Sequence, residues 1–204
     1  MVDDKTPREL VLVTGFGAFE EVVDNPSGAL AEALEGHRES GLEVCGRLLP
    51  VSFGRVGAAL DAVLDDLPRR PAAILCLGVQ KQNWFRLESR ARVQLPPDER
   101  FDVDGAPIPN EPLAADRDRA TVLDVERLRE ALERAGAHDA RVSDDAGGYV
   151  CEATYHHALR RADERGVPAL FLHVPPNAAV PVERQLPLVR GLLPHLLDPS
   201  NRRS

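Results

Sequence analysis

The sequence of 204 residues has no stripe of basic side chains, although it contains 25 lysines and arginines. Acidic residues outnumber them, and the formal net charge is −8 at neutral pH. A protein that binds nucleic acid through its phosphates needs a concentrated positive surface. The charge pattern therefore argues against nucleic acid as a partner.

Long apolar runs are also missing. A membrane-spanning helix needs about 20 consecutive apolar residues, and no segment approaches that length. The first ten residues, MVDDKTPREL, are polar and acidic, unlike a secretory signal peptide. We therefore expect no membrane association and a cytoplasmic location.

Cysteine is scarce and unpaired. Cys45, Cys76 and Cys151 are far apart and form neither a CxxC pair nor a spacing typical of a zinc site. In a reducing compartment each is expected to be a free thiol. No sequence feature indicates a metal or an organic cofactor.

What the sequence does contain is an alternation of short apolar runs with amphipathic stretches, typical of βα units around a parallel sheet. We predict one three-layer α/β/α domain with an open, mostly parallel twisted sheet over residues 1–197, and a disordered tail at 198–204. Strands are expected at 10–15, 44–49, 72–78, 140–142 and 169–174. Helices are expected after Asn25 and Pro26, from Ser52 to Leu67, from Asp124, from Val150, and over 182–197 with a disturbance at Pro187. Residues 80–110 lack helix signals, which predicts an extended arm or an edge strand there.

Of the three cysteines, Cys151 has the setting of a reactive thiol. It follows the turn Gly147-Gly148 and lies at the predicted start of a helix. Unpaired N–H groups at a helix start favour a thiolate and can also hold an oxyanion. Cys45 and Cys76 lie in apolar strands, where cysteine behaves as a small hydrophobe. Position alone leaves two interpretations of Cys151 open, a nucleophile or a residue that packs the helix start.

A cysteine nucleophile needs a base, and His173 is the best placed of the histidines. It ends the apolar strand ALFLH at the carboxyl edge of the predicted sheet, where open α/β sheets bind ligands. A strand-end histidine is often structural, so its pairing with Cys151 is what makes it a candidate. Glu88 lies in the irregular segment after the central strand. A carboxylate there can orient the imidazole, although an exposed surface charge is the alternative.

The segment TGFGAF, from Thr14 to Phe19, faintly resembles a dinucleotide-binding loop. The GxGxxG pattern would require glycine at the position of Glu20, and no Gly-Lys-Ser/Thr motif occurs. Phe16 and Phe19 instead follow the first strand, as ordinary core or as an apolar wall for a small uncharged ligand.

Four segments together resemble the pyroglutamyl peptidase I family of cysteine peptidases, and the match runs in order from about residue 10 to residue 193. The segments are LVTGFGAF, NPS, SDDAGGYVCEATYHHAL and FLHVPP. The segment around Cys151 is the most specific part. His173 matches the family's histidine, and Glu88 matches its glutamate by order and approximate offset. The resemblance implies removal of N-terminal pyroglutamate from small blocked peptides, with these three residues as nucleophile, base and orienting carboxylate, through an acyl-enzyme.

The resemblance also implies a substrate pocket. Phe16 and Phe19 would sandwich the lactam ring, with Tyr149 nearby, and backbone groups around Val79 would bind the lactam. Because family members often assemble, it further implies a homo-oligomer.

Two loops depart from the family's pattern. Glu20-Glu21 replace a usual Gly-Gly, and residues 80–83 replace a glycine-rich turn ending in arginine. Three hypotheses follow: a pyroglutamyl peptidase, a related cysteine amidase with altered acyl specificity, or a binding protein that keeps the fold. The intact catalytic trio favours the first two.

Overall fold

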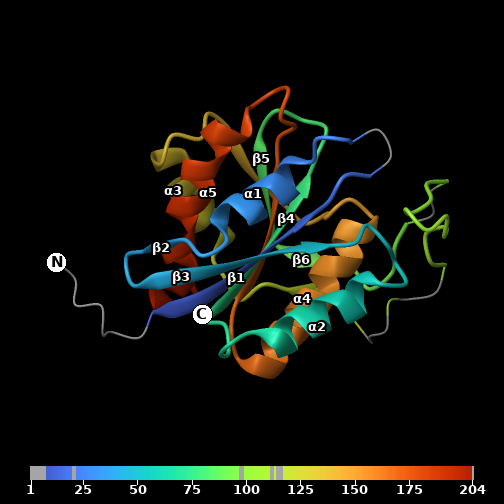
Figure 1. The fold of residues 1–204 in the computed structure, drawn as a ribbon, viewed down its shortest axis with the longest axis horizontal. Helices are drawn as coiled ribbons and strands as arrows, with labels where there is room; N and C mark the ends of the chain where they lie inside the picture. Colours follow the sequence, from blue (N-terminus) through green and yellow to red (C-terminus); the bar gives the residue numbers. More distant parts are fainter. Residues whose placement is uncertain (1–7, 20–21, 97–98, 111–112, 114–116, 204) are drawn as a thin grey trace.

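The structure is a computed structural model that describes residues 8–19, 22–96, 99–110, 113 and 117–203 (Figure 1). Within these residues, a seven-stranded sheet has the order β2-β3-β1-β4-β9-β5-β8. Its strands are β1 (Glu9–Phe16), β2 (Arg38–Glu39), β3 (Leu42–Leu49), β4 (Ala73–Val79), β5 (Phe85–Glu88), β8 (Ala140–Ser143) and β9 (Ala169–Val174). A separate small ladder pairs β6 (Arg90–Ala91) with β7 (Arg119–Ala120).

Most neighbours in the sheet are parallel. β1 pairs with β3 and β4, β4 with β9, and β5 with β8, all in parallel. Only the β2–β3 and β5–β9 pairs are antiparallel. The predicted α/β class with an open, mostly parallel sheet is therefore confirmed.

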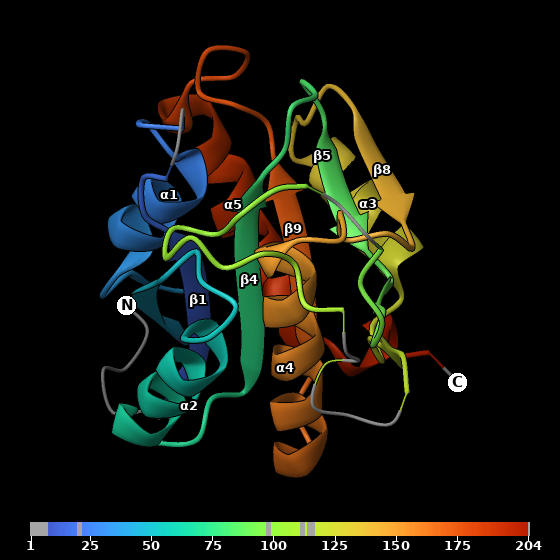
Figure 2. The same ribbon diagram turned by 90° about the vertical axis from the view of Figure 1, so that its right-hand side faces the viewer.

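Five helices among the described residues cover both faces of the sheet. On one face lie α1 (Pro26–Leu34), α3 (Val125–Arg134) and α5 (Val182–Leu197), and on the other lie α2 (Val56–Asp66) and α4 (Val150–Arg165) (Figures 1 and 2). Each face of the sheet has its own apolar core. One core lies between the sheet and α1, α3 and α5, and the other lies between the sheet and α2 and α4. β4 and β9 lie between the two cores and are almost wholly buried, as strands covered on both faces must be. None of the helices described is long and apolar enough to cross a membrane.

The helix ends follow from local chemistry. Asn25 caps α1 by accepting a hydrogen bond from the Ser27 amide at 3.2 Å, and Pro26 occupies the first turn. Asp124 caps α3 in the same way. Gly166 ends α4 with φ of 61°, a left-handed conformation that glycine adopts without strain.

Two local predictions are wrong. The helix expected from Ser52 begins at Val56, because the Phe53 amide donates to the Asp102 carboxylate at 2.8 Å and the Phe53 ring packs edge-on against Tyr149. The expected arm or edge strand after residue 80 contains β5, which lies inside the sheet between β9 and β8. The outer position on that side belongs to β8.

The segment expected to be a disordered tail is held against α3. Residues Pro199–Asn201 form a short 3₁₀ helix, and the Asn201 carbonyl accepts from the Asp124 amide at 2.8 Å. The Arg203 amide donates to the Val122 carbonyl at 2.7 Å. These hydrogen bonds depend on residues distant in sequence, so the polar composition of the segment gave no sign of them.

Candidate active site

Cys151 is the second residue of α4, on the side of the sheet that α2 also covers. The turn before it needs two left-handed residues, Gly147 with φ of 95° and Gly148 with φ of 60°. The sulfur rests against β4, since a Cβ placed on Gly78 would lie 3.1 Å from Sγ. Cys151 is half-buried, whereas Cys45 and Cys76 are buried. It is therefore the one thiol of the three that opens onto a cavity.

His173 and Glu88 are joined across neighbouring strands. The imidazole Nδ1 lies 2.7 Å from Glu88 Oε1, and both side chains are almost completely buried. The Tyr155 hydroxyl donates to the Glu88 carbonyl at 2.8 Å, which ties α4 to the end of β5. Because an ionised carboxylate only accepts, Nδ1 donates and Nε2 keeps its lone pair. This is the tautomer that a general base requires.

Cys151 and His173 line the same cavity, and His173 is the register partner of Gly78, against which the sulfur rests. In the described residues no hydrogen bond joins the thiol to the imidazole. Contacts between a nucleophile and its base are often loose before substrate binds. The structure thus brings together the three residues that the sequence singled out.

Arg86 is a fourth polar residue at this point, and the sequence interpretation missed it. Its Nε donates to Glu88 Oε1 at 2.6 Å, and Nη2 lies 3.3 Å from His173 Nδ1. The alternation of side chains along a strand offers a signal that was available, because residues two apart share a face. Arg86 and Glu88 stand in that relation on β5.

The protonation states follow from burial and from these charges. Burial lowers the pKa of His173 and Arg86 lowers it further, although Glu88 opposes both; the net shift is downward and favours the neutral imidazole. Burial, with the nearby charge of Glu88, raises the pKa of the Cys151 thiol to about 12. Helix-start stabilisation of a thiolate, expected from the sequence, therefore does not prevail, and the resting group is the thiol.

Glu152, next to the nucleophile, fixes the turn in place. Its carboxylate is fully buried and accepts from the Gly148 amide at 2.9 Å, the Arg92 amide at 2.8 Å and the Arg92 guanidinium at 2.7 Å. Arg92 also pairs with Asp145 at the other end of the turn. Strand β6, just after Glu88, is thereby tied to the start of α4.

The four residues assigned to substrate binding meet beside the thiol. A compartment of about 20 Å³ is lined by Phe16, Phe19, Val79 and Tyr149, together with Asn25, Val51, Val150 and Cys151. Its walls are almost wholly apolar, as a pocket for a neutral ring should be. That volume is enough for about one water molecule. Phe19 is the half-buried member of the aromatic group, and the compartment shares Phe19, Val79, Tyr149 and Cys151 with a larger cavity.

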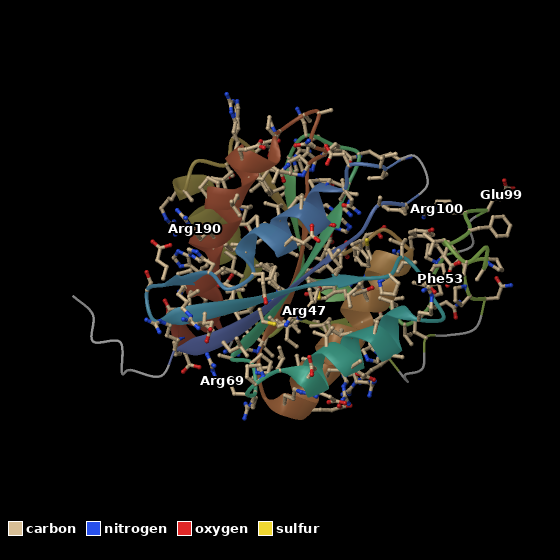
Figure 3. All side chains as sticks on the ribbon, in the orientation of Figure 1. Arg47, Phe53, Arg69, Glu99, Arg100 and Arg190 are labelled. Carbon is tan, nitrogen blue, oxygen red and sulfur yellow. The ribbon has the colours of Figure 1, made fainter. Side chains whose placement is uncertain are left out.

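A larger cavity of about 500 Å³ opens from the same point and contains Cys151, His173 and Arg86 in its lining. The segment 99–110 borders it, where the Arg100 guanidinium lies 4.6 Å above the Tyr149 ring. Figure 3 labels Arg100 and Phe53 on this side of the molecule, and Figure 2 shows the segment passing in front of the sheet. The cavity is large enough for the residues that follow an acyl group in a peptide.

No group of three or more histidine, cysteine, aspartate or glutamate side chains in the described part of the chain is arranged to hold a metal ion. Glu88 is hydrogen-bonded to both His173 and Arg86. The groups that meet at the cavity are a thiol, an imidazole and an arginine-bound carboxylate.

Comparison with known proteins places this geometry in a family. The pyroglutamyl peptidase family model matches residues 9–186. The chain belongs to the pyroglutamyl peptidase family. The pyrrolidone-carboxylate peptidase of Deinococcus radiodurans is 34% identical over 191 residues, covering 91% of this chain and 86% of that protein. That of Gloeobacter violaceus is 37% identical over 180 residues, covering 83% and 84%.

Solved structures of the family have the same fold. The pyrrolidone carboxyl peptidase of Fervidobacterium islandicum aligns with a TM-score of 0.84 at 25% identity, covering 93% of this chain and 98% of that one. The pyroglutamyl peptidase I of Bacillus amyloliquefaciens aligns with a TM-score of 0.86 at 19% identity, covering 97% and 99%, which shows the fold alone. The resemblance read from the sequence motifs is confirmed.

Proposed function

We propose that this protein is a cysteine omega-peptidase that removes N-terminal pyroglutamate from small peptides. The observation that carries the proposal is the 2.7 Å contact between His173 and Glu88, in a cavity that also contains the half-buried Cys151. Membership of the pyroglutamyl peptidase family gives the reaction class. The geometry of the site supports the residue roles.

The reaction begins with the thiol, because burial keeps Cys151 protonated. His173 Nε2 accepts the thiol proton as the sulfur attacks the pyroglutamyl carbonyl carbon. Glu88 stabilises the imidazolium that forms, and the backbone N–H groups at the start of α4 hold the oxyanion. The C–N bond then breaks, and the imidazolium gives its proton to the leaving amine.

The second half of the reaction releases the acyl group. A thioester now links the pyroglutamyl carbonyl to Cys151. His173, neutral again, takes a proton from water while the water oxygen attacks the carbonyl carbon. The C–S bond breaks, the thiol regains its proton, and free pyroglutamate leaves. The cycle consumes one water and one peptide bond and needs no other reactant.

Within this scheme, Phe16 and Phe19 take the two faces of the lactam ring, with Tyr149 beside it. Backbone groups near Val79 bind the lactam amide. The volume between these residues is only about 20 Å³, and we expect the half-buried Phe19 to shift as the ring enters. The peptide beyond the scissile bond lies in the larger cavity.

That small volume also favours a second candidate, a cysteine amidase for an acyl group other than pyroglutamate. The residues after β4 differ from the family's glycine-rich pattern, and Gln80, Lys81 and Gln82 line the larger cavity. Glu20 and Glu21, the other departure, lie outside the described residues. The same catalytic residues would serve either acyl group, so substrate comparison distinguishes the two.

The test is a panel of aryl amides that differ only in the acyl group: pyroglutamyl, prolyl, acetyl and glutaminyl. The proposal predicts that kcat/KM is highest for the pyroglutamyl amide, with Cys151→Ala as the blank. A higher value for another acyl group would replace the proposal with the second candidate. Cytoplasmic location and assembly into a homo-oligomer stay predictions, the latter open to analytical ultracentrifugation.

A further inference from the structure

Arg86 is in direct contact with both members of the histidine–carboxylate pair. Its Nε donates to Glu88 Oε1 at 2.6 Å, and Nη2 lies 3.3 Å from His173 Nδ1. The side chain is 24% exposed and lines the larger cavity with Cys151. Nη2 also lies 3.9 Å from the Cβ position of Gly147, in the turn before the nucleophile. One guanidinium therefore touches the base and its carboxylate and lies near the nucleophile turn.

The two polar contacts at His173 Nδ1 cannot both be hydrogen bonds. Glu88 Oε1 accepts, so Nδ1 carries a hydrogen and donates to it. Arg86 Nη2 is a donor as well, which sets one N–H beside another. The contact between Arg86 and the imidazole therefore acts through charge.

That charge opposes a second proton on the imidazole. An imidazolium beside a guanidinium is repelled, whereas the carboxylate of Glu88 attracts it. Arg86 also binds Oε1, the oxygen that Glu88 offers to His173. Glu88 Oε2 has no hydrogen-bond partner within the described residues, so the guanidinium and the imidazole share a single oxygen. Both effects of Arg86 favour the neutral ring.

Other charged or titratable groups surround His173 at greater distance. They come from α4, the segment 99–110, the loop after β4 and the loop before α1: Cys151, Glu152, Arg100, Lys81 and Asp24. Within the described part of the chain, Glu88 and Arg86 alone make polar contacts with the imidazole. A change in the charge of Arg86 should therefore affect His173 more directly than a change in any of the others.

We propose that Arg86 is a positioning residue of the active site, which holds Glu88 by one oxygen and keeps His173 neutral so that it can accept the thiol proton. Its charge extends the working range of the base to lower pH. The inference deepens the proposed function and rests on it for the kinetic part of the test.

The kinetic test is the pH dependence of kcat/KM for a pyroglutamyl aryl amide. In Arg86→Gln we expect the acidic limb to move to higher pH by about one unit, because the loss of a neighbouring positive charge makes His173 easier to protonate. Arg86→Lys keeps the charge, so its acidic limb should lie close to that of the wild type. Arg141→Gln is the matched control, since Arg141 lies opposite Arg86 in the β5–β8 register and pairs with Asp139 at the surface.

An NMR titration of the His173 ring proton, assigned with His173→Asn, follows the same equilibrium without substrate. A midpoint displaced to higher pH in Arg86→Gln, and unchanged in Arg141→Gln, supports the proposal. The proposal is overturned if the midpoint in Arg86→Gln is unchanged or lies at lower pH. It is also overturned if Arg86→Gln loses activity while the acidic limb of kcat/KM stays at the wild-type pH. If the wild type does not hydrolyse the amide but the NMR midpoint moves as expected, the proposed function fails and the role of Arg86 stands.

Discussion

Replacing Glu88 by glutamine removes one charge from the centre of the site with little change of shape. Oε1 accepts both from Arg86 Nε at 2.6 Å and from His173 Nδ1 at 2.7 Å. A glutamine whose carbonyl oxygen takes this position keeps both hydrogen bonds, and its amide group replaces Oε2. The reversed amide would set its N–H groups against the Arg86 donor, so Arg86 selects the orientation that preserves the base tautomer.

The magnitude follows from what is lost. Replacing the triad carboxylate by an amide costs about 10⁴ in kcat where the wrong tautomer results. Because Arg86 keeps the tautomer in Glu88→Gln, only stabilisation of the imidazolium is removed, and we expect a loss of about 10²–10³ in kcat. The carboxylate raises the pKa of His173, so its removal lowers that pKa. The acidic limb of kcat/KM should therefore move to lower pH, opposite to the shift expected for Arg86→Gln.

The assay is steady-state hydrolysis of a pyroglutamyl aryl amide across pH, with circular dichroism to establish folding. Glu126→Gln on α3 is the control, because its side chain is 62% exposed and far from the site in the fold. A folded Glu88→Gln variant with wild-type kcat, or with its acidic limb at higher pH, would refute the assignment of Glu88 to the base.

Three further substitutions test how the site is held. Gly78→Ala places a Cβ 2.8 Å from a buried phenylalanine ring and 3.1 Å from the Cys151 sulfur, so we expect about 1–3 kcal/mol of destabilisation and a reduced kcat. The control is Gly54→Ala, which has open space around it and should leave the thermal melt and the rate unchanged. Asn25→Ala removes the α1 cap and the 2.9 Å hydrogen bond to the Gly17 carbonyl. We expect a loss of about 1 kcal/mol in a thermal melt and a rise in KM larger than any fall in kcat, whereas an unchanged KM would contradict the pocket assignment. Arg92→Met leaves the buried carboxylate of Glu152 without its guanidinium and should lower the free energy of unfolding in urea by about 3 kcal/mol. Adding Glu152→Gln should restore part of this loss, and no recovery in the double variant would contradict the pairing.

Much of the fold could be predicted because its signals are local. Apolar runs gave β9 at its observed bounds, and Asn25 and Asp124 marked the starts of α1 and α3. β5 was misplaced because its position inside the sheet depends on antiparallel pairing with β9, a contact between residues far apart in sequence. The same reason explains the contacts of residues 199–203 with α3.

The site divides in the same way. Cys151 and His173 carried position signals, a helix start and a strand end, and the structure sets both at one cavity. Arg86 was missed because its importance depends on the β5–β9 register, which sets Arg86 opposite His173. Burial, which raises the pKa of the Cys151 thiol, cannot be inferred from a helix start.

The role of Cys151 as the nucleophile of a pyroglutamyl peptidase can be tested by the rate of amine release from a pyroglutamyl aryl amide under reducing conditions. Wild type should be compared with Cys151→Ala, and with Cys45→Ala and Cys76→Ala, which alter the two buried thiols. We expect turnover by the wild type and by both control variants, and none by Cys151→Ala. Turnover that persists in Cys151→Ala, or a folded wild type that releases no amine, would contradict it.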